Sequence, residues 1–253
     1  MGCYAQTEIG HGSNVAALET TATLDKTTDE FIIHTPSITA TKYWPGDLGR
    51  FSSHAVVFAR LIIDEADFGV QPFMVQIRDV ETWKIREGVK CGDLGPKIGY
   101  NSKDNGWCSF DKVRIPRADM LQGLCEVSKE GEMNLKGDVR VLYSVMMGIR
   151  MLIVQSMGTF FSILPARNAI RYCVVRRQFS TQQGTRDERK VIDYQTTSFT
   201  FAKLLARGYT MTLCGNWVAA EFERMMKDIN NQVFSRMDGL HHILSGFKAT
   251  FSN

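Results

Sequence analysis

The sequence predicts an α+β fold in two parts. A β-barrel or β-sandwich of antiparallel strands is expected over residues 1–118, and an α-helical bundle over residues 138–253, with a linker at 119–137. Two observations support this division. Short runs rich in Thr, Val, Ile and Phe alternate with turn residues in the first part. In the second part, apolar residues recur every three or four positions. The polar run at 130–137 is the natural connection.

The expected strands follow in order along the first part. Residues 18–24 and 31–35 flank a polar turn and are typical of a β-hairpin. β-Branched apolar runs at 55–62 and 70–77 predict two longer strands. A glycine-rich stretch at 92–106 separates these from a last strand at 110–115, which Pro116 closes. Short strands spaced by turns favour a small barrel or sandwich.

Helical periodicity covers residues 142–179 and 192–234. Pro165 lies inside the first run, which predicts a kink or a break at that point. The runs 142–164 and 233–251 carry more hydrophobic side chains than one small β domain can cover. We therefore expect exposed apolar patches or a partner surface on these helices.

The composition excludes several classes of protein. The 253 residues carry a net charge of only +3, which is too small to indicate nucleic-acid binding. The six cysteines form no Cys-x-x-Cys pair and have no histidine at ligand spacing, so we predict neither a disulfide framework nor a metal site. The longest apolar stretch, 151–164, predicts no membrane span, and the first ten residues predict no secretory signal.

Two segments of the first part could bind a ligand. In the loop at 4–14, glycines allow a close backbone approach, and Thr7 and Ser13 offer short hydrogen-bonding side chains. An ordinary turn is the alternative. In the run at 42–49, Trp44 stands next to a Pro-Gly turn and can offer a flat apolar face to a planar ring. The alternative is a tryptophan that plugs the end of the β core.

A third segment lies in the helical part. Residues 171–179 carry several arginines, including Arg176, and further basic residues follow at 186–190 among acidic ones. Arginine is the planar donor best suited to phosphate, so the segment could bind an anion. The alternative, a solvated helix end, is the usual explanation for such a run.

In this order, the segments resemble the acyl-CoA oxidase family, the flavin enzymes of peroxisomal fatty-acid β-oxidation. The resemblance rests on Gly-Cys-Tyr-Ala-Gln-Thr-Glu at 2–8 with Gly-His-Gly at 10–12, and on Tyr-Trp-Pro-Gly at 43–46. It continues through 93–100, Asp-Asn-Gly at 104–106, Arg-Ile-Pro-Arg at 114–117, the basic segment at 170–178 and Asp-Tyr-Gln-Thr at 193–196. It covers essentially the whole chain.

The resemblance implies FAD as cofactor and assigns roles to individual residues. Thr7 and Gly46 match positions that hold the flavin, and Trp44 would lie close to its ring. Arg176 and Phe179 match residues that reach the FAD of a neighbouring subunit. Gln195 matches a residue at the adenosine end of FAD, and Ser13, more weakly, one that contacts the acyl-CoA. A homodimer and a peroxisomal location are implied in the same way.

The implied reaction oxidises an acyl-CoA to a trans-2-enoyl-CoA and reduces O₂ to H₂O₂. A carboxylate removes the Cα proton, and the resemblance places this catalytic base beyond Asn253, with an all-α domain before Met1. No glutamate of this chain matches the base; Glu8 is the tempting substitute but belongs to the flavin loop. We therefore expect a truncated acyl-CoA dehydrogenase-like fold that has no turnover on its own. The alternatives are a catalytically inactive interaction subunit and an acyl-CoA dehydrogenase.

Overall fold

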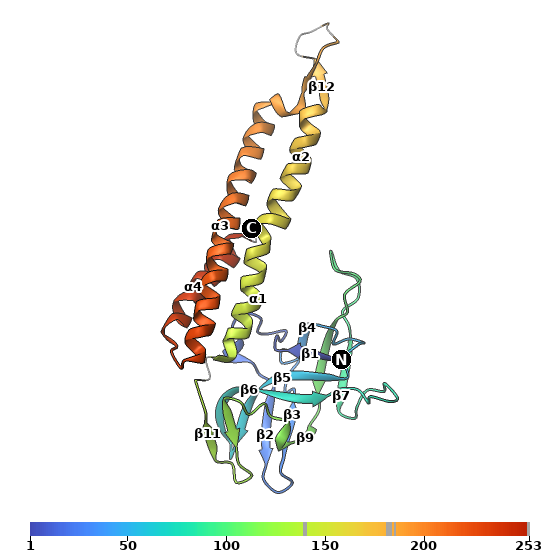
Figure 1. Ribbon diagram of the computed structural model, residues 1–253. Coiled ribbons are helices and arrows are strands. Elements are labelled where there is room, and N and C mark those ends of the chain that lie inside the picture. The colour runs from blue at the N-terminus through green and yellow to red at the C-terminus, as the bar shows by residue number, and fades with distance from the viewer. Residues whose placement is uncertain (139–140, 181–183, 185, 252–253) are drawn as a thin grey trace. The chain divides into compact units, whose positions relative to one another are not determined.

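The computed structural model describes residues 1–138, 141–180, 184 and 186–251, and the chain forms two compact units (Figure 1). Unit 1 comprises residues 1–139 and consists of strands and short turns of helix. Unit 2 comprises residues 140–253 and is almost entirely helical among its described residues. The predicted α+β fold class is confirmed.

The larger sheet of unit 1 is built around one long strand. It contains β1 (Gly2–Ala5), β2 (Thr21–Asp25), β3 (Glu30–His34), β5 (His54–Ile63), β6 (Ala66–Gln76) and β9 (Val113–Pro116). The first half of β5 pairs with β1 and its second half with β2, while β6 pairs along nearly its whole length. The predicted hairpin is present as the antiparallel pair β2–β3.

Strand direction differs from the prediction at two places. Both β1 and β2 run parallel to β5, whereas the sequence predicts antiparallel strands only. Strand direction depends on how the connection between β1 and β2 returns to the sheet, and the residue pattern of the strands carries no information on this. The other pairs within the named strands of unit 1 are antiparallel.

A second sheet has three strands and contains the predicted ligand-binding residues Trp44 and Gly46. It has the order β4 (Lys42–Gly46), β8 (Asn105–Phe110) and β7 (Val89–Asp93). Burial alternates along β8, which places one face of this sheet on the core. That core is continuous with the larger sheet and includes the edge-to-face pair Phe31 and Phe73, whose ring centroids lie 5.0 Å apart.

Two strand predictions need correction. Residues 110–115 are not one strand: β8 ends at Phe110, and β9 begins at Val113 after a turn in which Lys112 has a φ of 52°. Residues 119–137 are not a bare linker, because β10 (Cys125–Val127) and β11 (Met133–Leu135) form a hairpin there. Cys125 and Val127 are fully buried and belong to the core of unit 1, so the polar residues around them are hairpin surface.

Unit 2 begins with a long helical run that changes its winding once. The run consists of α1 (Leu142–Ser156), the π-helical segment η4 (Met157–Ile163) and α2 (Leu164–Val175). Pro165 lies in the first turn of α2, where it needs no intrahelical donor. Its ring would still crowd the carbonyl four residues earlier, and the wider π turns relieve that clash. The predicted irregularity at Pro165 is confirmed.

After α2, the described part of unit 2 continues with β12 (Arg177–Ser180), β13 (Glu188–Lys190), η5 (Val191–Asp193), α3 (Gln195–Asn230) and α4 (Ser235–Phe251). The helix predicted to reach residue 179 ends at Val175, because the chain becomes extended at Arg176 and starts an antiparallel hairpin. In Figure 1, β12 continues from the end of α2 and α3 returns beside it.

Glycines bring the helices of unit 2 into close contact. A Cβ on Gly215 of α3 would lie 2.7 Å from Gln155 Cα, and one on Gly158 would lie 2.6 Å from Thr212 N. Only glycine permits backbones to pack this closely. A buried cluster that includes Met147, Val154, Val218 and Met225 completes the core of this unit.

Much apolar surface of unit 2 stays exposed, as the sequence predicts. It includes Leu152, Phe160, Phe161, Tyr209 and Leu213. By length and composition alone, the helical run Ser144–Val175 is one that could also cross a membrane. The structure joins residues 151–164 to their neighbours in one helix, but core helices of soluble proteins meet the same criterion.

Candidate functional site

The loop that contains Thr7 lies against β4. The amide of Tyr43 donates to the Thr7 carbonyl at 3.0 Å, and Glu8 and Lys42 form an antiparallel bridge. Ile9 and Gly10 extend the contact through further backbone bonds to residues 41 and 39. Thr7, which is half-buried, therefore lies directly beside Tyr43 and one residue from Trp44.

Trp44 is presented to solvent by a bulge in β4. Tyr43 pairs with Trp107 and Gly46 with Asn105, so two residues, Trp44 and Pro45, stand opposite one residue of β8. Trp44 has a φ of 84°, a left-handed conformation that bulky residues rarely adopt. Its side chain remains 53% exposed, which excludes the alternative of a plug in the β core.

Ser13 lies at the exposed end of the same loop. A Cβ on Gly12 would lie 3.8 Å from the Thr7 methyl carbon, so the two ends of the loop approach each other at this point. Ser13 itself is exposed and precedes the short helix η1 (Val15–Ala17). The structure thus brings together Thr7, Trp44 and Gly46 on unit 1, with Ser13 at the margin.

A buried ion pair supports this surface from within. The Lys42 ammonium lies 2.8 Å from Glu8 Oε1, and both side chains are inaccessible to solvent. Lys42 also donates to the carbonyls of Gln6, at 3.2 Å, and Phe58, at 2.6 Å. Burial lowers the pKa of Lys42 from 10.5 to about 8, and the Glu8 carboxylate partly offsets this effect.

The Glu8 carboxylate is fully engaged. Oε1 accepts from the amide and hydroxyl of Thr20, and Oε2 accepts from the amide of Glu19 at 2.7 Å. A general base needs a lone pair within reach of the substrate, and every contact of this carboxylate is internal. Glu8 is therefore a structural group. The base that the resemblance places beyond Asn253 lies outside the described residues.

Arg176 and Phe179 lie at the hairpin end of unit 2. Arg176 is the first extended residue after α2, and its guanidinium donates to the Gln178 side chain at 2.9 Å. Phe179 on β12 is 72% exposed and has a φ of 63°. Like Trp44, it is an aromatic residue held in a strained conformation with its ring toward solvent, a combination that is concentrated at functional sites.

Gln195 is exposed and forms the first residue of α3, close to the same hairpin. The preceding Tyr194 donates its hydroxyl to the Gln178 carbonyl at 2.8 Å, which ties the start of α3 to β12. Arg189 lies over the Tyr194 ring, 5.3 Å from its centroid. Arg176, Phe179 and Gln195 thus occupy one end of unit 2.

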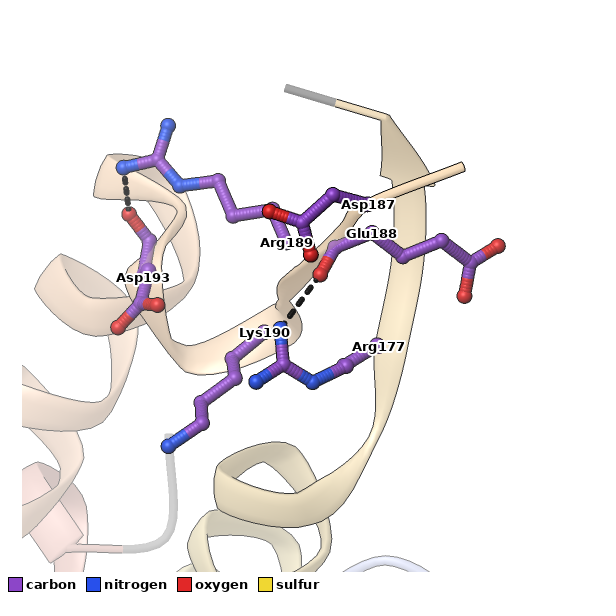
Figure 2. A pocket seen from close by; sticks show the side chains of 6 residues that line it. All are labelled: Arg177, Asp187, Glu188, Arg189, Lys190 and Asp193. Carbon is purple, nitrogen blue, oxygen red and sulfur yellow. Dashed lines mark hydrogen bonds between the residues drawn. The ribbon is translucent and has the colours of Figure 1, made fainter. Parts of the chain in front are cut away.

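An open depression of about 520 Å³ lies at this end. Figure 2 shows the six residues that line it: Arg177, Asp187, Glu188, Arg189, Lys190 and Asp193. Arg177 donates to the Glu188 carbonyl and Arg189 to the Asp193 carbonyl, as the dashed lines mark. Three basic and three acidic side chains balance one another, so the depression alone does not select an anion.

No group of three or more His, Cys, Asp or Glu side chains that could hold a metal occurs within the described ranges. The six cysteines are free thiols. The features that sequence reasoning missed are the pairing of Glu8 with Lys42 and the left-handed backbone of Trp44. In the sequence, Lys42 is simply a charged residue at the start of a strand-like run. Lysines on the protein surface give the same pattern, so the pattern does not reveal that Lys42 is buried.

Comparison with known proteins identifies both units. Residues 3–113 match the family model of the acyl-CoA dehydrogenase middle domain, and residues 143–253 match that of the acyl-CoA oxidase C-alpha1 domain. Among curated proteins, peroxisomal acyl-coenzyme A oxidase 1 of Arabidopsis thaliana is 43% identical over 254 residues. That alignment covers 98% of this chain and 38% of the Arabidopsis enzyme.

Solved structures of acyl-CoA oxidases are also similar to this chain. An acyl-CoA oxidase from tomato is 45% identical with a TM-score of 0.90, and the match covers 99% of this chain and 38% of that one. Acyl-CoA oxidase-2 of Caenorhabditis elegans, bound with FAD, ascaroside-CoA and ATP, is 39% identical with a TM-score of 0.91, at 99% and 38% coverage.

The two units together define a protein of the acyl-CoA dehydrogenase type, with a middle β domain followed by a helical domain. Within that class, the chain belongs to the acyl-CoA oxidase family. It spans about 38% of the length of the relatives reported above.

Proposed function

We propose that this chain is the flavin- and acyl-CoA-binding part of an FAD-dependent acyl-CoA oxidase, which converts acyl-CoA to trans-2-enoyl-CoA and reduces O₂ to H₂O₂. The observation that carries the proposal is the shared surface of Thr7, Trp44 and Gly46 on the unit that matches an acyl-CoA dehydrogenase middle domain. FAD and ascaroside-CoA in the C. elegans relative support both ligand classes.

The residues present fit a flavin. Trp44 offers a half-exposed flat ring, Thr7 a short hydroxyl on the segment that pairs with β4, and Gly46 a backbone without a side chain. A Cβ at Gly46 would lie 2.8 Å from Lys103 Cε, so this position accepts only glycine without displacing Lys103. Bound FAD supplies hydride acceptance from Cβ of the acyl chain. We assign Thr7 and Gly46 to the polar edge of the isoalloxazine.

Trp44 has a different task in this proposal. Its indole covers the ring system and excludes water from the reacting end of the acyl-CoA, with Ser13 at the margin of the same surface. We do not assign removal of the Cα proton to Glu8, since its carboxylate is fully engaged in internal contacts. We accordingly propose no catalytic residue within residues 1–253 and expect no turnover from this chain on its own.

The hairpin end of unit 2 is proposed to hold the remote part of FAD. Arg176 supplies a planar guanidinium suited to pyrophosphate. Phe179 supplies an exposed ring, and Gln195 an amide at the start of a long helix. In the parent family such contacts reach a neighbouring subunit, which implies a homodimer.

The remaining proposals concern partners and location. The name of the Arabidopsis relative, peroxisomal acyl-coenzyme A oxidase 1, supports a peroxisomal location. We propose no membrane span for Ser144–Val175, because Gly158 packs on α3 and Arg150 donates to Ser245 of α4 at 2.8 Å. A nucleic-acid partner is not proposed, in keeping with the net charge of +3.

The activity test uses the whole enzyme of which this chain is proposed to be a part, purified with its flavin, and residues 1–253 alone serve as the control that should give no peroxide. Acyl-CoA is added in air and H₂O₂ is followed with a peroxidase-coupled dye. We expect peroxide in proportion to enoyl-CoA. Turnover only with an artificial electron acceptor would indicate a dehydrogenase instead. Flavin without any turnover would favour an inactive interaction subunit, a reading that the exposed Phe160, Phe161 and Leu213 of unit 2 would suit.

A further inference from the structure

Asn105 is the residue of β8 that contacts the bulge in β4. Its side-chain amide donates to the Trp44 carbonyl at 2.9 Å, while its backbone pairs with Gly46. Trp44 has a φ of 84°, which disfavours any residue with a Cβ. Strained backbone of this kind persists only where the surroundings fix it. The Asn105 amide is the side-chain hydrogen bond that acts directly on this peptide.

The residue before Asn105 fixes the other end of the same loop. Asp104 is buried, and its Oδ2 accepts the amides of Arg50 at 2.7 Å and Phe51 at 3.1 Å. The Asp104 carbonyl accepts the amide of Asp47. Residues 44–51, called the Trp44 loop below, are therefore held at both ends by two adjacent residues, Asp104 and the first residue of β8, Asn105.

Two glycines allow this close approach. A Cβ on Gly49 would overlap Asp104 Oδ1, and a Cβ on Gly106 would overlap the backbone of Gly49. The Trp44 loop therefore lies directly on β8, with no side chain between the two backbones. A shift of Asn105 or Asp104 would therefore move the backbone of the Trp44 loop directly.

We propose that Asn105 is a positioning residue of the flavin site, which holds the left-handed Trp44 peptide and thereby aims the indole at the bound ring. The proposal rests on the proposed flavin function of Trp44. Asp104 supports it by fixing residues 47–51. Asn105 itself touches neither flavin nor substrate in this role; it acts through Trp44.

The test compares two substitutions that convert the same amide to a carboxylate. Asn105→Asp replaces the donor by an acceptor that faces the Trp44 carbonyl, and Asn134→Asp makes the same change at an exposed position of β11. FAD affinity of the chain is measured by titration of flavin fluorescence. We expect about tenfold weaker binding for Asn105→Asp, the size of one lost hydrogen bond, and an unchanged affinity for Asn134→Asp.

A second readout does not depend on the cofactor. The four tryptophans give separate indole signals in a ¹H–¹⁵N spectrum. Asn105→Asp is expected to shift or broaden the Trp44 signal and to leave those of Trp83 and Trp217 in place. A variant that merely unfolds the chain would instead collapse all of the signals.

A double-mutant cycle isolates the path through Trp44. With Trp44→Gly, residue 44 adopts a positive φ freely, so Asn105→Asp should then change FAD affinity less than it does in the wild type. Equal effects in both backgrounds, or wild-type affinity of Asn105→Asp, would overturn the proposal. If the wild-type chain binds no FAD, the proposed function fails; an unmoved Trp44 indole signal would then show separately that the positioning claim fails too.

Discussion

Lys42 Nζ and Glu8 Oε1 lie 2.8 Å apart in the interior of unit 1, directly beneath the surface that carries Thr7 and Trp44. Each partner belongs to one of the two segments that form the candidate site. The pair therefore links the Thr7 loop to β4 from below, and the Gln6 carbonyl, which also accepts from Lys42, strengthens the link.

Breaking this pair from one side should be costly. Lys42→Met leaves a buried carboxylate without its counter-ion, so we expect the free energy of unfolding to fall by about 3–5 kcal/mol. Urea unfolding measures this directly. The double variant Glu8→Gln/Lys42→Met removes both charges and should lose less than the sum of the two single changes.

The exposed pair between Lys136 and Glu126 provides a matched control, since its atoms lie 2.7 Å apart but both side chains reach solvent. Glu126→Gln should change stability by less than about 1 kcal/mol. Equal losses at the buried and the exposed pair would contradict this account of Lys42.

Lys42 also gives stability a pH dependence of definite sign. Its folded pKa is about 8, below the 10.5 of an ordinary lysine, so the unfolded chain holds more protons between these values. The contribution of Lys42 to stability is therefore flat below about pH 8 and rises toward pH 10.5, by up to ~1.4 kcal/mol per pH unit. The Cys3 thiol acts in the opposite direction, because burial raises its pKa from 9.0 to about 11.

The Lys42 effect can be isolated by subtraction. Cys3 is present in both wild type and Lys42→Met, so the difference between their unfolding free energies removes its contribution. We expect the unfolding free energy of the wild type minus that of Lys42→Met to increase steadily from about pH 8 to about pH 10. The lowered pKa of Lys42 sets this window. A difference that stays constant with pH would show that Lys42 titrates normally.

The strained backbone at Trp44 should reverse the usual order of stability of alanine and glycine variants. In a regular strand, glycine is less stable than alanine by about 0.5–1 kcal/mol. At residue 44, with a φ of 84°, we expect Trp44→Gly to be more stable than Trp44→Ala by about 1 kcal/mol. Thermal unfolding of the two variants compares them. Both lack the indole, so both should bind FAD weakly, and a more stable alanine variant would refute the strain.

Close helix packing in unit 2 can be tested at Gly215. A Cβ there would lie 2.7 Å from Gln155 Cα, so Gly215→Ala must separate α1 from α3, at a cost of about 1–3 kcal/mol. Gly239 on α4 has no atom within 4 Å of its added Cβ, and Gly239→Ala should stabilise the helix by about 0.5–1 kcal/mol. Helical circular dichroism during heating measures both; a neutral Gly215→Ala would rule out the tight contact.

The sequence predicts the fold class and several elements from local patterns. The β2–β3 hairpin has a polar turn between alternating strands, and the irregularity before Pro165 follows from the clash of a proline ring with the preceding helical turn. Other features depend on contacts between distant residues. The parallel pairing of β1 and β2 with β5, and the core position of Cys125, are decided by packing that local composition does not encode.

In the candidate site, too, the sequence predicts local features but not the contacts between distant residues. The exposed Trp44 next to a Pro-Gly turn could be anticipated, because that residue pattern favours a presented ring. The partner of Glu8 could not, since Lys42 is 34 residues away and looks like any polar strand residue. The hydrogen bond from Asn105 spans 61 residues and depends on the bulge register of β4 and β8.

The central claim is that Thr7, Trp44 and Gly46 form a flavin site. Its most direct test is the absorbance spectrum of the chain after incubation with FAD and gel filtration, with Trp44→Ala treated in parallel. We expect the bands of oxidised flavin to elute with the wild-type chain and to be strongly reduced for Trp44→Ala. Flavin that elutes only as free FAD, or equally with both proteins, would contradict the claim.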